Sequence, residues 1–171
     1  MNECIDKRAA NVVKLLSDKG KKAATAESCT GGLLSAAITS VSGSSEVFEM
    51  GVCSYANSVK EKALGVDPQT LERYGAVSEQ VAKEMAQGIM KAAASDFGVS
   101  TTGIAGPTGG SVEKPVGTVW IGVGTKTSCH AERFLFGTEN CPEELTEREY
   151  IRQQAVCKAL ELLQKEIEQN N

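Results

Sequence analysis

The chain has 171 residues, 18 basic and 22 acidic side chains and a single histidine, giving a net charge of −4. This length corresponds to about one domain, assigned to residues 1–171, and the apolar runs are too short for a membrane helix or a secretory signal. The charge argues against a broad basic nucleic-acid face, and His130 alone cannot build a histidine-rich metal site, so we expect no metal, membrane or nucleic-acid partner.

The first half of the chain alternates between helical and strand-like patterns. Apolar residues at helical spacing predict a first helix that ends at Gly20: Ile5, Ala9, Val12 and Leu16. A buried strand, a tightly packed helix and a second strand are then predicted over 22–27, 33–38 and 48–55. Asn57 is expected to cap a short helix that carries Lys60, and Asp67 followed by Pro68 is a further helix start.

The second half continues the alternation. Ser78 begins the longest central helix, whose apolar face comprises Val81, Met85 and Ile89. Three strands follow, the last two as a hairpin: 99–104, 116–123 and 129–136. Asn140 to Glu143 has capping-box chemistry and is expected to open a C-terminal helix. We therefore expect an α/β fold, a single three-layer αβα domain in which helices cover a mixed sheet.

The cysteine pattern indicates whether the cellular compartment of the protein is oxidising or reducing. None of the six cysteines (4, 29, 53, 129, 141 and 157) forms a CxxC pair, so zinc-ribbon and thioredoxin-type spacings are absent. Cys29, Cys53 and Cys129 have the small or apolar neighbours that are typical of buried thiols. These features predict a reducing, cytoplasmic location.

One candidate for chemistry is the segment ESCTGG (27–32), at a predicted strand-to-helix turn. A hydroxyl or thiol there lies near helix-terminal N–H groups, which favour an anion or an oxyanion. Alternatively, Ser28 only caps the helix and the glycines allow close packing. Cys29 is a second candidate nucleophile, but without a nearby histidine its thiolate needs a lysine or a helix N-terminus.

A second candidate is Lys60, which lies five residues after Tyr55 at the end of a predicted strand. Most lysines are solvated surface charges. In a chain with no histidine nearby, however, a serine hydrolase can use a neutral lysine as its base, because desolvation lowers the lysine pKa.

The third candidate is the glycine-rich loop over 101–117, which lacks both the P-loop and the dinucleotide-binding patterns. Its SVEK string (111–114) matches SxxK by accident, since Gly110 and Pro115 forbid the required helix. His130 is expected to be structural. Arg148 and Arg152 share a helix face, where they are either solvated or able to bind a phosphate.

Several segments, in order, resemble the CinA C-terminal domain family, which includes the nicotinamide-nucleotide amidohydrolases. The resemblance covers about 5–165 without large gaps and includes no match to the molybdopterin-binding-like domain of full-length members, so we expect a stand-alone form. The segments are AESCTGG (26–32), GSSEVFEMG (43–51), SYANSVKEKALGV (54–66), GAVSE (75–79), TGIAGPTGG (102–110) and KPVGTVWIGV (114–123).

The resemblance implies hydrolysis of nicotinamide mononucleotide to nicotinate mononucleotide and ammonia in pyridine-nucleotide recycling, without a cofactor, by a homo-oligomer. It implies that Ser28 is the nucleophile, Lys60 the general base and Tyr55 a residue that relays or orients the proton. Arg148 would meet the nucleotide phosphate. The remaining substrate-binding residues implied by the motifs, or expected as oxyanion donors, are Thr30, Gly31, Gly32, Ser45, Thr102, Gly103, Ala105 and Gly106.

Two other functions are compatible with the sequence. Members of this family are also associated with competence and DNA-damage responses, which would make the chain a non-enzymatic interaction protein. The same hydrolytic residues could also act on a different small amide.

Overall fold

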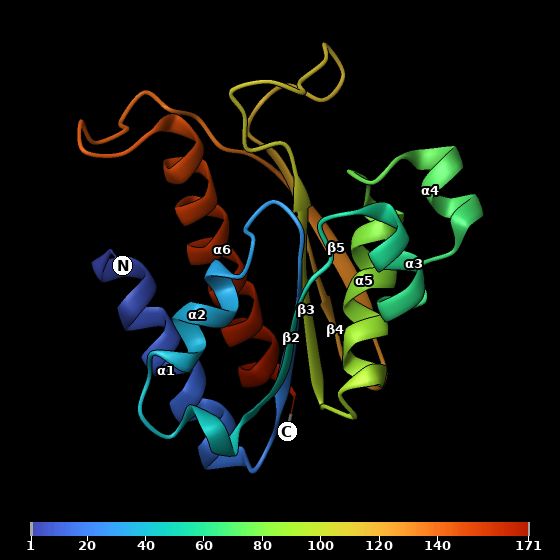
Figure 1. Ribbon diagram of the computed structural model, residues 1–171. Coiled ribbons are helices and arrows are strands. Elements are labelled where there is room, and N and C mark those ends of the chain that lie inside the picture. Colours follow the sequence, from blue (N-terminus) through green and yellow to red (C-terminus); the bar gives the residue numbers. More distant parts are fainter. Residues whose placement is uncertain (1, 171) are drawn as a thin grey trace.

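A computed structural model describes residues 2–170 and contains a mixed five-stranded sheet in the order β2-β1-β3-β4-β5 (Figure 1). The strands are β1 (Ala23–Glu27), β2 (Phe48–Cys53), β3 (Phe97–Gly103), β4 (Thr118–Gly124) and β5 (Cys129–Leu135). β1 is parallel to β2 and β3, whereas β4 is antiparallel to both β3 and β5. The carboxyl ends of β1, β2 and β3 therefore meet at one end of the sheet, where α/β proteins commonly bind ligands.

Helices cover both faces of this sheet, which confirms the expected three-layer αβα architecture (Figure 1). One layer contains α1 (Glu3–Lys19), α2 (Leu33–Thr39) and α6 (Glu147–Gln169); the other contains α3 (Asn57–Leu64), α4 (Pro68–Tyr74) and α5 (Glu79–Ala92). A short 3-10 helix, η1 (Ser44–Glu46), leads into β2. The larger core lies between the sheet and the α1–α2–α6 layer, and a smaller core lies under α5.

Most of the local signals in the sequence correspond to the observed element ends. α1 ends at Gly20, whose φ of 60° is in the left-handed region that favours glycine. Ser78 caps α5 by accepting from the N–H of Val81, and Asp67 caps α4 by accepting from the N–H of Gln69. The predicted β4–β5 hairpin is also present.

The predicted start of the C-terminal helix is wrong. α6 begins after Thr146, whose hydroxyl accepts from the N–H of Glu149 while the Glu149 carboxylate accepts from the N–H of Thr146. This reciprocal pair satisfies the N–H groups of Thr146 and Glu149 at the start of α6. Residues 140–145, where the helix start was predicted, instead form an irregular loop. Asn57 is likewise the first residue of α3 rather than its cap.

The cysteines differ from the expectation in two respects. A disulfide joins Cys4 on α1 to Cys157 on α6, which the sequence spacing did not predict. Cys53 is exposed because β2 is an edge strand, and Cys129 is only half-buried, whereas Cys29 is buried as predicted. Within residues 2–170, every helix is too short or too polar to cross a bilayer.

Candidate active site

Ser28 follows directly after β1, the strand between β2 and β3, at the carboxyl end of the parallel strands. Its N–H donates to the carbonyl of Thr101 on β3 (2.9 Å). On the other side of β1, the N–H of Ser54 donates to the carbonyl of Glu27 (2.7 Å). The serine is thus fixed between the ends of two neighbouring strands.

Lys60 lies on the buried face of α3, with only 1% of its surface exposed. Its Nζ lies 3.3 Å from the Ser28 Oγ and donates to the carbonyl of Ser54 at 2.7 Å. Within residues 2–170 it forms no salt bridge. Burial lowers the pKa of Lys60 below 10.5, because desolvation disfavours its charged form. The surface-charge interpretation of this lysine is therefore wrong.

Tyr55 lies at the mouth of the site and is 65% exposed. Its backbone carbonyl lies 3.4 Å from the Lys60 Nζ, while its hydroxyl accepts from the Arg148 guanidinium at 3.1 Å. The structure thus brings Tyr55 to the site but does not place its hydroxyl on either Lys60 or Ser28.

A cavity of about 360 Å³ opens beside Ser28 and Lys60. Arg148 lines it and also donates to the carbonyl of Gly106, whereas Arg152 donates to the carbonyl of Thr30. Arg148 is therefore the arginine available to a ligand. The predicted site residues that line the cavity are Ser28, Tyr55, Lys60, Thr102, Gly103, Ala105, Gly106 and Arg148.

Four of the predicted site residues lie elsewhere. Ser45 is in η1, before β2, at the opposite end of the parallel strands. Thr30 is buried, with its hydroxyl bonded to Glu27 and Thr101. The N–H groups of Gly31 and Gly32 are bonded to the Ser28 carbonyl and the Glu27 carboxylate.

The N–H groups of Gly31 and Gly32 are therefore not free to stabilise an oxyanion. Within residues 2–170, the N–H groups of Cys29 and Thr30 donate to no acceptor. Since Cys29 directly follows Ser28 and lines the cavity, its N–H is the better candidate for an oxyanion donor.

The role of Glu27 was not predicted from the sequence. Its carboxylate is fully buried and accepts five hydrogen bonds, from the Thr30 hydroxyl, the N–H groups of Gly32, Leu34 and Ser35, and the Ser35 hydroxyl. Glu27 thus caps the N-terminus of α2 from the end of β1 and shapes the loop that carries Ser28. An acidic residue at the end of a buried strand, directly before a Ser/Gly-rich turn, was the available signal.

Replacing Glu27 with Ala should lower the free energy of unfolding by about 3 kcal/mol, because buried N–H groups of α2 lose their acceptor. Glu27→Gln should also lower the free energy of unfolding, since the NH₂ group of the new side chain would face N–H donors. Urea denaturation of both variants, with the exposed Glu46→Ala as control, measures the effect. Equal stabilities for the Glu27 and Glu46 variants would contradict the capping role.

Cys29 lines the cavity but is a poor nucleophile. Burial raises the pKa of its thiol to about 12, with the charge of Glu27 contributing in the same direction. The thiolate that a cysteine nucleophile requires is therefore disfavoured at neutral pH.

We expect Cys29→Ala to keep the activity within a few-fold of the unaltered protein. With iodoacetamide at neutral pH, the exposed Cys53 should be alkylated much faster than Cys29, as peptide mass mapping would show. Rapid alkylation of Cys29, with parallel loss of activity, would instead identify it as the reactive group.

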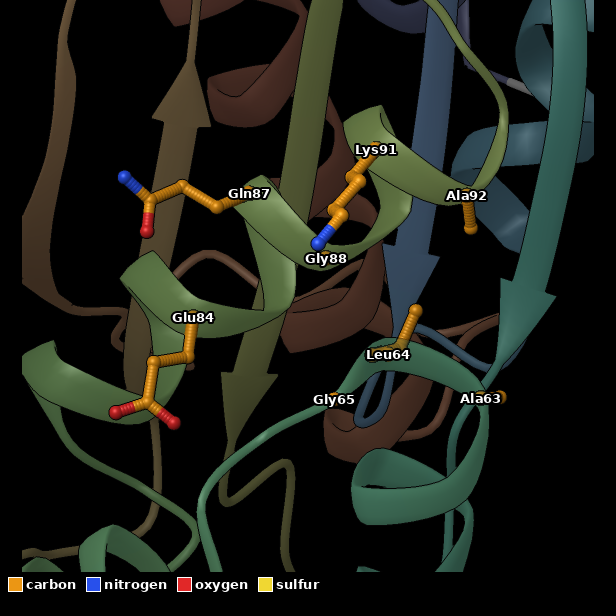
Figure 2. A pocket seen from close by; sticks show the side chains of 8 residues that line it. All are labelled: Ala63, Leu64, Gly65, Glu84, Gln87, Gly88, Lys91 and Ala92. Atoms are coloured by element: carbon orange, nitrogen blue, oxygen red, sulfur yellow. The ribbon is translucent and has the colours of Figure 1, made fainter.

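A larger cavity, about 530 Å³, lies between α3 and α5, away from this site (Figure 2). Its ionisable side chains are Glu84 and Lys91, and Glu84 already accepts from the Asp67 N–H and the Thr70 hydroxyl. It contains neither a nucleophile nor a buried base. Size alone therefore does not identify the reactive cavity, and the chemistry favours the smaller one.

Comparisons with known proteins agree with this fold. A "Putative competence-damage inducible protein" of Thermoanaerobacter pseudethanolicus is 49% identical over 154 residues, covering 90% of this chain but 35% of the relative. A "CinA-like protein" of Chlorobaculum tepidum is 56% identical over 115 residues, covering 67% of this chain and 27% of that protein. The chain thus spans about a third of the length of the curated relatives it matches.

Solved structures extend the similarity over nearly the whole chain. The competence/damage inducible protein CihA of Agrobacterium tumefaciens has a TM-score of 0.88 and 38% identity, covering 95% of both chains. The competence damage-inducible protein A of Klebsiella pneumoniae has a TM-score of 0.89 and 30% identity, covering 98% of this chain and 99% of that one. The CinA C-terminal domain also matches residues 5–167, and the chain therefore belongs to the CinA C-terminal domain family.

Proposed function

We propose that this protein is an amidohydrolase that converts nicotinamide mononucleotide to nicotinate mononucleotide and ammonia. The observation that carries the proposal is the 3.3 Å contact between the Ser28 Oγ and the Nζ of the buried Lys60, which has no carboxylate partner within residues 2–170. A hydroxyl beside a desolvated amine is the pairing that a serine–lysine hydrolase requires.

In the proposed reaction, neutral Lys60 takes the proton of Ser28 as its Oγ attacks the carboxamide carbon. The N–H of Cys29, the residue after the nucleophile, would stabilise the resulting oxyanion. Collapse of this intermediate breaks the C–N bond, and protonated Lys60 gives its proton to the departing ammonia. Water, deprotonated by Lys60, then cleaves the acyl-serine ester to release the carboxylic acid and restore Ser28.

The shape and charge of the cavity suit a small nucleotide. Arg148 provides a positive charge at the cavity wall, and residues 103–106 also line the cavity. Arg148 would bind the 5′-phosphate, since a guanidinium matches phosphate geometry. A local site of this kind is compatible with a net charge of −4.

We expect Arg148→Gln to raise KM for nicotinamide mononucleotide by about tenfold to a hundredfold, because the variant loses a charge-assisted contact with the phosphate. The kcat should change only a few-fold. Steady-state kinetics checks this, with the exposed Lys62→Gln as a control for the change in net charge. A KM equal to that of the control would remove Arg148 from the phosphate site.

The direct test is an ammonia assay with the purified protein and nicotinamide mononucleotide. Ammonia released stoichiometrically with nicotinate mononucleotide supports the proposal. Release from other small amides but not from this nucleotide would support a hydrolase of different specificity. The names of the relatives favour a second candidate, a non-enzymatic role in competence or damage responses, and absence of turnover on any amide would favour it.

A cytoplasmic location and a homo-oligomeric state are further parts of the proposal. The cysteine spacings support the first, while the Cys4–Cys157 disulfide does not fit a reducing compartment. Thiol labelling in intact cells and light scattering of the purified protein would test the two points.

A further inference from the structure

A separate cavity of about 380 Å³ lies on the α4–α5 side of the sheet. Its walls come from the end of α4, the start of α5, strands β4 and β5 and the loop around Lys114. It shares Val77 with the cavity that contains Ser28, but none of the proposed catalytic residues lines it. The proposed amidase reaction leaves this cavity without a role.

Two aromatic side chains form part of its wall. Trp120, the only tryptophan of the chain, lies half-buried on β4, and Tyr74 is at the C-terminal end of α4. The Arg73 guanidinium lies 5.2 Å from the centre of the Tyr74 ring, which leaves a cation beside this wall. A half-buried indole in a concave site offers a planar surface for stacking of another ring.

Two further cations line the cavity. Arg133 lies opposite Trp120 in the β4–β5 register and donates to the carbonyl of Glu113, and Lys114 donates to the carbonyl of Tyr74. Within residues 2–170 neither has a carboxylate within 4.0 Å. Each therefore keeps donors that could bind an anion.

Two carboxylates also belong to the wall. Glu79 is paired with Lys83 along α5, at an i, i+4 spacing. Glu113 accepts from the neutral hydroxyl of Ser111 and keeps its negative charge, but it forms no direct ion pair with Lys114 or Arg133 within residues 2–170. Lys114 and Arg133 together outweigh the single unpaired carboxylate, so the wall combines two aromatic rings with one net positive charge.

We propose that this cavity binds an anion that carries a planar aromatic ring, specifically a mononucleotide, at a site separate from the one that contains Ser28. The ring stacks on Trp120, and the phosphate meets Lys114 and Arg133. The site does not depend on the amidase proposal, because binding here requires no catalytic residue. Its occupant would contact the glycine-rich loop that also borders the other cavity.

The single tryptophan makes the test direct. Trp120 fluorescence is titrated with AMP, adenosine and inorganic phosphate, with free N-acetyltryptophanamide as a correction for light absorption by the ligand. AMP should change the emission saturably with a Kd below about 1 mM. Adenosine and phosphate should each bind at least about tenfold more weakly, because each lacks one of the two recognised groups.

Trp120 pairs with Thr102, which lines the cavity that contains Ser28, so variants must show in which of the two cavities AMP binds. Lys114→Gln combined with Arg133→Gln should weaken AMP binding about tenfold or more, while Arg148→Gln and the control Lys62→Gln should leave it unchanged. Circular dichroism verifies that each variant is folded. No saturable change with AMP, or a loss only in Arg148→Gln, would overturn the proposal whether or not the protein is an amidase.

Discussion

Replacing Ser28 with Ala should reduce ammonia release from nicotinamide mononucleotide by at least about a thousandfold, as expected for loss of a covalent nucleophile. The fold should be unaffected, because the hydroxyl makes one side-chain contact, with Lys60, and the backbone N–H that fixes the loop is retained. We expect the free energy of unfolding to change by less than about 1 kcal/mol. Ammonia assays and urea denaturation on the same preparation measure both quantities.

The chain offers two matched controls for this variant. Cys29→Ala changes the next residue in the same loop, and Ser45→Ala removes a serine that the family resemblance implied but that lies at the opposite end of the parallel strands. Both should keep nearly full activity. Turnover retained by Ser28→Ala would eliminate it as the nucleophile, and a loss of activity in Ser45→Ala would mean that the catalytic assembly extends beyond this cavity.

The order of elements was predictable because each has a strong local signal. Helix periodicity in α1, the Asp67-Pro68 start of α4 and the Ser78 cap of α5 all depend on residues within one or two turns. The single histidine of the chain directed attention to lysine as a base, and the family resemblance implied Lys60 for that role. A single count thus directed the search for a base toward lysine.

The remaining features depend on contacts between segments that are far apart in sequence. No spacing rule brings Cys4 to Cys157, or places the Tyr55 hydroxyl on Arg148 across 93 positions. The position of Ser45 follows from β2 running parallel to β1, so that η1 enters at the end opposite Ser28.

The sequence signal at Glu27 does not by itself assign its role, because that role depends on which way α2 points. The residue lies next to Ser28 in sequence, but its carboxylate turns toward the N–H groups of Leu34 and Ser35 instead of toward the cavity. The same five hydrogen bonds show why Gly32 cannot stabilise an oxyanion, because its N–H is already used. The position of Glu27 next to Ser28 in the sequence therefore predicted that it lies near the nucleophile, but not that it caps α2.

Replacing Lys60 with Ala should lower kcat/KM by about a hundredfold to ten-thousandfold, the range for loss of a general base. Burial lowers the pKa of Lys60 below its ordinary 10.5, and only the unprotonated amine can accept the serine proton. In the unaltered protein kcat/KM should therefore rise with pH, and its inflection should fall below 10.5. Lys60→Arg should be equally inactive, because a guanidinium does not lose its proton.

The same pKa shift predicts a stability effect that a loss of activity alone would not reveal. In the folded protein Lys60 gives up its proton at a lower pH than in the unfolded chain, where its pKa is close to 10.5. Between these two values the unfolded state binds more protons, so the free energy of unfolding should rise with pH. Lys60→Met, which fills the same buried space without a charge, should remove this rise as well as the activity. Two results would show that Lys60 is not the desolvated base: an inflection of kcat/KM at or above pH 10.5, or a rise in the free energy of unfolding with pH that persists in Lys60→Met.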